Sequence, residues 1–139
     1  GATEEFVVGR AKVVRQSDND QVTVIGAGVT LFEALTAHEQ LKNEGINIRV
    51  VDLFSVQPID SETLIRAARA TNGRVVTVED HYAHGGIGDA VLSALSTEEV
   101  KVHKLAVREI ARSGRPNELL DKFGISARHI VESVKSFLG

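Results

Sequence analysis

The sequence predicts an α/β fold, a three-layer αβα sandwich in which a five-stranded, mostly parallel sheet lies between two layers of helices. Short apolar runs rich in Val and Ile alternate with segments whose apolar residues recur at helical spacing. Such alternation is typical of right-handed βαβ units, whose strands lie parallel. No linker, internal repeat or low-complexity tract interrupts the pattern, so residues 1–139 are expected to form a single domain.

Turn residues and helix caps place the individual elements. The strands are expected at 11–15, 21–25, 46–54, from 74 to about 80, and at 100–107. The helices are expected from 30 to about 44, from 60 to about 72, 87–96 and 116–123, with a last one from 126.

Three of these helices have an expected N-cap. Thr30 is expected to cap the first, with Glu33 three residues later completing a capping box. Asp60 is expected to cap the second and Ser126 the last, because their side-chain oxygens accept hydrogen bonds from free backbone N–H groups. His38 lies on the apolar face of the first helix and is interpreted as a packed core or interface residue rather than a base.

The composition argues against several classes of protein. A net charge of −3, with Lys and Arg interspersed among Asp and Glu, argues against a nucleic-acid binder and a polybasic membrane anchor. Cysteine is absent, and no apolar run approaches the roughly 20 residues that span a bilayer. The chain has no Met and no N-terminal secretory signal. We therefore expect a domain excised from a longer protein, with residues 1–5 a linker or a remnant of the expression vector.

The turn Gly26-Ala27-Gly28 lies between a strand and a helix, as in dinucleotide-binding folds. That pattern needs a third glycine three positions after the second, where this chain has Leu31. Asp52, after the next strand, mimics the acid that holds a ribose hydroxyl. Because the third glycine is missing, a plain strand-to-helix turn is the favoured interpretation.

A candidate interface or ligand loop follows the fourth strand, at the edge of the sheet where open α/β folds bind their ligands and partners. Its candidate residues are Glu79, Asp80, His81, Gly85, Gly86 and Gly88. Together with His84, the polar members resemble a metal cluster, but metal sites generally need three or four converging ligands. We favour the interpretation in which Glu79 and Asp80 accept hydrogen bonds from loop amides or cap the next helix. An anion resting on amides around Gly86 and Gly88 is physically possible, although the two carboxylates would oppose it.

Three arginines follow the last strand. Arg108, Arg112 and Arg115 lie around Ser113-Gly114 and are weak candidates to clamp a phosphate bidentately. A solvated loop, or pairing with a neighbouring domain, is the favoured alternative.

Four stretches of the chain carry a resemblance to a known family. They are residues 22–31, 48–52 with 57–60, 77–82 with 85–88, and 112–120 with 123–125. In order and spacing they resemble the C-terminal domain of transketolase, in particular that of the animal-type and transketolase-like proteins. Related domains form the C-terminal part of other thiamine-diphosphate enzymes.

The resemblance implies a sheet whose first strand is an antiparallel edge strand. It also implies that the chain belongs to a cytoplasmic, homodimeric parent enzyme of the pentose phosphate pathway. That parent is either an active transketolase or a transketolase-like paralogue. Such an enzyme transfers a two-carbon ketol unit from a ketose phosphate to an aldose phosphate with thiamine diphosphate and Mg or Ca. The implied partners are the N-terminal and middle domains and the second subunit, with neither nucleic acid nor membrane.

The resemblance brings no catalytic, cofactor-binding or metal-binding residue to this chain. The family binds the diphosphate and metal through a Gly-Asp-Gly motif, whereas here Gly88-Asp89 is followed by Ala90. The chain alone is therefore expected to be an inactive scaffold and dimer-interface domain. The alternative is a regulatory domain that binds a nucleotide or phosphometabolite at its glycine turns.

Overall fold

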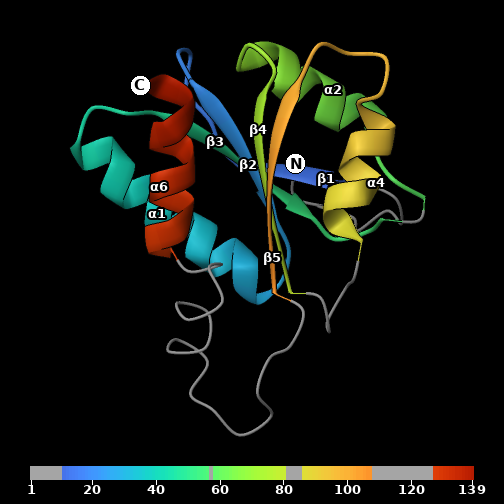
Figure 1. The fold of residues 1–139 in the computed structure, drawn as a ribbon, viewed down its shortest axis with the longest axis horizontal. Coiled ribbons are helices and arrows are strands. Elements are labelled where there is room, and N and C mark those ends of the chain that lie inside the picture. Colours follow the sequence, from blue (N-terminus) through green and yellow to red (C-terminus); the bar gives the residue numbers. More distant parts are fainter. Residues whose placement is uncertain (1–10, 57, 81–85, 108–126) are drawn as a thin grey trace, which may run out of the picture.

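The structure, a computed structural model, describes residues 11–56, 58–80, 86–107 and 127–139. Within them a sheet of five strands lies between helices, which confirms the predicted fold (Figure 1). The strands are β1 (Ala11–Arg15), β2 (Val22–Gly26), β3 (Ile48–Leu53), β4 (Arg74–Asp80) and β5 (Lys101–Val107). The helices are α1 (Val29–Asn43), α2 (Ser61–Ala70), α4 (Ile87–Ala94) and α6 (Ala127–Leu138). Residues 1–5, the helix predicted at 116–123 and the Ser126 cap lie outside the described residues.

The sheet has the order β1-β3-β2-β4-β5. Strands β2, β3, β4 and β5 run parallel, and β1 pairs with β3 in the antiparallel direction. The antiparallel edge strand implied by the resemblance is therefore confirmed. Because β2 lies between β3 and β4, the carboxyl ends of three parallel strands meet at one edge, next to the glycine turn that follows β2.

Alternate strand residues form two apolar clusters, one on each face of the sheet. Val24, Val50 and Val76 belong to the cluster that α1 and α6 cover (Figure 1). Ile25 and Val75 belong to the cluster that α2 and α4 cover. Strands that are buried on both faces need apolar side chains at nearly every position, which explains why the central strands are so rich in Val and Ile.

The capping box predicted for α1 is wrong. Thr30 lies inside the helix, where its hydroxyl accepts a hydrogen bond from the Ala27 N–H at 3.0 Å and donates to the Ala27 carbonyl at 2.8 Å. Gly28 takes the N-cap position and offers no side chain. Glu33 instead accepts a hydrogen bond at 3.0 Å from the backbone N–H of Ala127, the first residue of α6, 94 residues away. The carboxylate therefore holds the last helix against the first.

The predicted cap of α2 is confirmed. Asp60 accepts hydrogen bonds from the backbone N–H of Thr63 at 3.1 Å and from its hydroxyl at 2.7 Å. The same carboxylate accepts a third hydrogen bond at 3.0 Å from the N–H of Ala11, at the start of β1. One side chain thus begins a helix and attaches the edge strand to it.

The turn between α2 and β4 packs directly against the segment that leads into β5. Gly73 has φ +76°, and a Cβ atom there would lie only 2.2 Å from the carbonyl oxygen of Glu99. Its N–H donates to the Ala68 carbonyl and its own carbonyl accepts from the Lys101 N–H, both at 2.8 Å. Glycine is the residue that combines this left-handed backbone with such a close approach. The contact sets the amino ends of β4 and β5 side by side.

The substitution Gly73→Ala is expected to lower the free energy of unfolding by about 2–4 kcal/mol, because backbone strain adds to a clash with a carbonyl oxygen. Urea unfolding followed by circular dichroism measures the loss. Gly45→Ala is the matched control, since Gly45 also has a positive φ, +79°, but no atom within 4 Å of an added Cβ. Its cost is expected near ~1 kcal/mol. Equal losses in the two variants would contradict the packing role of Gly73.

Candidate functional site

The candidate site lies at the carboxyl edge of the sheet, where β2, β3 and β4 end and where α1 and α4 begin (Figure 1). Two connections form its described part. One is the glycine turn from β2 to α1, and the other is the start of α4, reached from the end of β4. The side chains at these two places decide which ligands the edge can hold.

Glu79, near the end of β4, is the central side chain of the site. It is only 5% exposed, and its carboxylate accepts three hydrogen bonds from backbone N–H groups at the start of α4. The donors are Gly86 at 2.7 Å, Ile87 at 3.1 Å and Gly88 at 2.9 Å. A carboxylate at this position satisfies the free amides of the first helical turn and is favoured by the helix dipole. The interpretation of Glu79 as an acceptor for loop amides is confirmed.

These three bonds occupy the amides that an anion would need. A phosphate at Gly86 and Gly88 would have to displace the Glu79 carboxylate and then lie beside its negative charge. The favourable interaction between an anion and the helix N-terminus is therefore already made within the protein. The edge at α4 is built as a closed structural junction.

The first turn of α4 also packs closely on the sheet. A Cβ atom at Gly88 would lie 2.6 Å from Cδ of Lys104 and 3.2 Å from the hydroxyl oxygen of Thr77. Lys104 passes over this glycine and its Nζ lies 3.0 Å from the carboxylate of Asp89, which is 81% exposed. Thr77 is fully buried, and its hydroxyl is the buried side-chain group without a hydrogen-bond partner in the described part of the chain. Gly88 is therefore needed for packing.

The glycine turn after β2 is likewise closed by the chain itself. A Cβ atom at Gly26 would lie 3.1 Å from atoms of Thr30 and Leu31, so the helix approaches the strand closely at Gly26 rather than at the third-glycine position. The Thr30 hydroxyl occupies the N–H of Ala27, one of the amides that a phosphate would contact. This geometry favours the plain strand-to-helix turn over a dinucleotide site.

Asp52 has a partner other than a ribose. It lies beside Gly26 in the parallel register and directly opposite Lys12 on the antiparallel strand β1. Burial raises the pKa of the Asp52 carboxyl, and the positive charge of Lys12 opposes that rise. The acid is therefore explained by cross-strand pairing at the edge of the sheet.

The remaining predicted residues are placed as follows. Asp80 is half-buried at the end of β4, and His38 is half-buried on α1 with Nδ1 2.9 Å from the Glu39 carboxylate. The positions outside the described residues are His81, His84, Gly85, Arg108, Arg112 and Arg115. Among the side chains that are described, no three His, Asp or Glu residues are grouped to hold a metal ion. None of the described helices combines the length and the apolar character needed to cross a bilayer.

The sequence alone does not predict the hydrogen bond from Glu33 to α6 or the ion pair between Lys104 and Asp89. The parallel register places Lys104 beside Thr77, which in turn lies below α4. Knowing that register beforehand would have located Lys104 at the start of α4. The partner of Glu33 lies too far along the chain for a local rule to find it.

Comparison with known proteins gives the family of this fold. The family model described as transketolase, C-terminal domain, matches residues 9–130. Transketolase-like protein 2 of Mus musculus is 61% identical over 135 residues, which cover 96% of this chain and 22% of the relative. Transketolase of Homo sapiens is 55% identical over 136 residues, covering 97% of this chain and 22% of the relative.

The solved structures agree with this result. A split-gene transketolase, described as an inactive beta4 tetramer, aligns with a TM-score of 0.81 and 38% identity, over 96% of this chain and 43% of the other. The chain thus spans about a fifth of the length of the curated relatives it matches. By its sequence, its strand order and its structural likeness, the chain belongs to the family of transketolase C-terminal domains.

Proposed function

We propose that this chain, as one domain over residues 1–139, is the scaffold and interface domain of a larger transketolase or transketolase-like enzyme. The observation that carries the proposal is the closed Glu79 junction, in which the Glu79 carboxylate bonds to the amides at the start of α4 instead of leaving them to a ligand. The limited share of the relatives that the chain spans supports it as well. The chemistry of the parent belongs to its other domains.

The parent enzyme transfers a two-carbon ketol unit from a ketose phosphate to an aldose phosphate in the pentose phosphate pathway. It works in the cytoplasm as a homodimer, with thiamine diphosphate and Mg or Ca as cofactors. This part of the proposal rests on the family and on the high identity to animal transketolases. In the parent, this domain packs against the N-terminal and middle domains and against the second subunit.

The described residues do not fit a thiamine diphosphate site. The Gly-Asp-Gly motif is absent, because Gly88-Asp89 is followed by Ala90, and the Asp89 carboxylate pairs with Lys104. The amides at the start of α4 donate to Glu79. No step of the transfer reaction is therefore assigned to this chain.

Two apolar side chains at the start of α1 support an interface at the carboxyl edge. Phe32 is 68% exposed and Val29 is 38% exposed, and both lie in the first turn of α1. An exposed aromatic side chain is a common centre of a protein interface, because its burial removes a large apolar area from water. The edge therefore suits contact with another part of the parent better than contact with a charged ligand.

Calorimetric titration of the 139-residue chain with thiamine diphosphate and Mg²⁺ is expected to show no micromolar binding, and the chain is expected to transfer no ketol unit. The physical reason is that the sequence has no Gly-Asp-Gly motif at Gly88-Asp89 and that Glu79 occupies the amides at the start of α4. The full-length parent is the positive control under the same conditions. Micromolar binding to the chain alone would overturn the proposal.

The substitution Glu79→Ala is expected to lower the free energy of unfolding by about 3 kcal/mol, because three amide groups lose a charged acceptor. Asp89→Ala is the matched control. Asp89 lies in the first turn of α4, whose amides bond to Glu79, but it forms only an exposed ion pair with Lys104. Its loss is therefore expected to cost under ~1 kcal/mol. Urea unfolding measures both. If the free energy of unfolding falls no further in the Glu79 variant than in the control, Glu79 does not have this structural role.

The substitution Phe32→Ala is expected to change the stability of the isolated chain by less than about 0.5 kcal/mol, since most of the ring is already in water. In the full-length parent the same change is expected to lower the thermal midpoint or weaken the dimer. Differential scanning calorimetry and analytical ultracentrifugation measure these effects. Gln40→Ala, on an exposed position of the same helix, is the control. An unchanged parent would rule out an interface at Phe32.

A further inference from the structure

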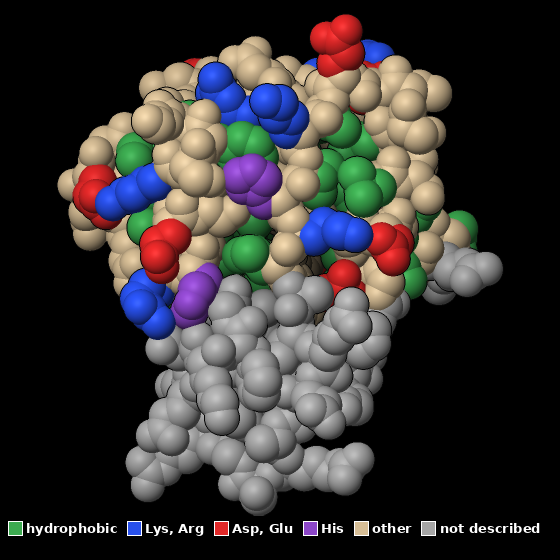
Figure 2. Space-filling view, viewed as in Figure 1, with side chains coloured by type: hydrophobic (Ala, Val, Ile, Leu, Met, Phe, Trp, Pro, Cys, Tyr) green, Lys and Arg blue, Asp and Glu red, His purple; other side chains and the backbone are tan. Residues whose placement is uncertain are grey.

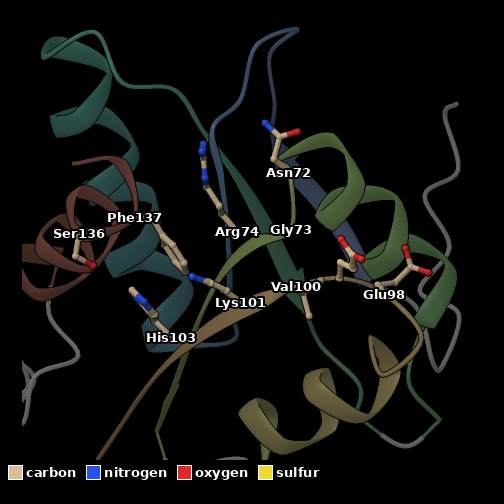
Figure 3. Close-up of a pocket in the computed structure, with 10 residues that line it drawn as sticks. Asn72, Gly73, Arg74, Glu98, Val100, Lys101, His103, Ser136 and Phe137 are labelled. Carbon is tan, nitrogen blue, oxygen red and sulfur yellow. The ribbon is translucent and has the colours of Figure 1, made fainter.

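A hollow of about 750 Å³ opens at the amino edge of the sheet, opposite the Glu79 junction (Figure 3). It lies where β4 and β5 begin, between the turn that contains Gly73 and the end of α6. Its volume is in the range of pockets that take small metabolites, roughly 300–1,000 Å³. Figure 3 shows Arg74, Lys101 and His103 with Phe137 on one side of it and Glu98 on the other.

The strand register brings the basic side chains of this hollow together. Arg74 and Lys101 are direct neighbours across the parallel pair β4 and β5, and His103 follows two residues later on β5. Arg74 is two residues from Val76, which belongs to the cluster covered by α6. Because side chains alternate between the faces of a strand, all three basic residues project on the α6 side.

The positive charges of Arg74 and Lys101 are not compensated by the described residues. Neither side chain forms an ion pair or a hydrogen bond within the described ranges, and like charges directly opposite on neighbouring strands destabilise a sheet. Two acids also line the hollow: Glu98 is already held by Arg69 through two bonds of 2.6 and 3.0 Å, and Glu99 is exposed and forms no ion pair with Arg74 or Lys101. Figure 2 shows Lys and Arg side chains gathered beside a histidine near the top of this face, with no acidic side chain between them.

The His103 ring is held in a fixed position beside these charges. Its Nδ1 lies 2.9 Å from the hydroxyl of Ser133, and its ring stacks on Phe137 with centroids 3.8 Å apart and 10° between the planes. Nε2, on the other side of the ring, makes no hydrogen bond within the described part of the chain. A ring fixed in this way loses little side-chain entropy when it binds a ligand.

We propose that this hollow binds a small phosphorylated metabolite through its phosphate monoester group. Arg74 presents a fork of donors that matches two phosphate oxygens, Lys101 adds a second positive charge, and Nε2 of His103 provides a further hydrogen-bonding group. Two neighbouring cations match the charge of a phosphate monoester, which approaches −2 at neutral pH. Gly73 makes the site possible, because its contact with Glu99 brings the two basic strand ends together. The site is separate from the proposed interface edge and does not depend on it.

The test is a ¹H–¹⁵N NMR titration of the 139-residue chain with inorganic phosphate and with glycerol 3-phosphate, with NaCl holding the ionic strength constant. Saturable shifts are expected at the amides of Arg74, Lys101 and His103. The double variant Arg74→Gln/Lys101→Gln is expected to weaken binding about tenfold or more, because both charged contacts are lost. Arg66→Gln is the matched control, since Arg66 is 70% exposed and lies on α2. It is expected to bind as the unaltered chain does.

Removal of a like-charge contact is expected to leave the double variant folded, with a thermal midpoint at low salt equal to or above that of the unaltered chain. If that variant does not fold, Lys101→Gln alone serves, because Lys101 is exposed. Three results would overturn the proposal. They are shifts that never saturate, shifts that centre on another part of the chain, and binding that persists unchanged in the variants. Any of them would mean that the basic pair faces an acidic protein surface or solvent only.

Discussion

A carboxylate buried at the end of a central strand needs hydrogen-bond donors, and Glu79 takes three of them from the backbone at the start of α4. These bonds join β4 to the helix that follows it and neutralise the amides that make a helix N-terminus attractive to anions. The carboxyl edge is the usual ligand-binding edge of an open α/β sheet. In this chain Glu79 occupies the amides at the start of α4, and the exposed side chain of Phe32 lies in the first turn of α1, the helix that follows β2. The described residues of the carboxyl edge therefore favour packing against protein over binding of a ligand.

Much of the fold could be predicted from the sequence, because each element carries its own local signal. The strands are Val-rich runs, and Asp60 is followed by an apolar helical repeat, so both are recognisable without knowledge of the rest of the chain. The error at Thr30 and Glu33 has a different origin. The spacing of the two residues fits a capping box, but the Glu33 carboxylate accepts its hydrogen bond from the start of the distant helix α6 instead.

The two edges of the sheet differ in how far they could be predicted. The role of Glu79 follows from local reasoning, since a carboxylate seven to nine residues before free helical amides is within reach of them. The hollow lined by Arg74 and Lys101 cannot be predicted by local reasoning. Arg74 and Lys101 are far apart in sequence and ordinary in character, and only the pairing of β4 with β5 makes them neighbours. Cross-strand register is set by the whole sheet, so no short motif reports it.

The position of α6 affects the order in which the chain can fold. Ile130 and Val134 complete the apolar cluster on one face of the sheet, and Glu33 and Glu44 of the first helical segment hold the two ends of α6. This face is therefore covered only in part, by α1, until the ribosome has released nearly all of the domain. Contacts between such distant parts of a chain form slowly, because a long loop must close first. Until then the sheet exposes apolar surface, and such surface makes a partly folded chain prone to aggregate.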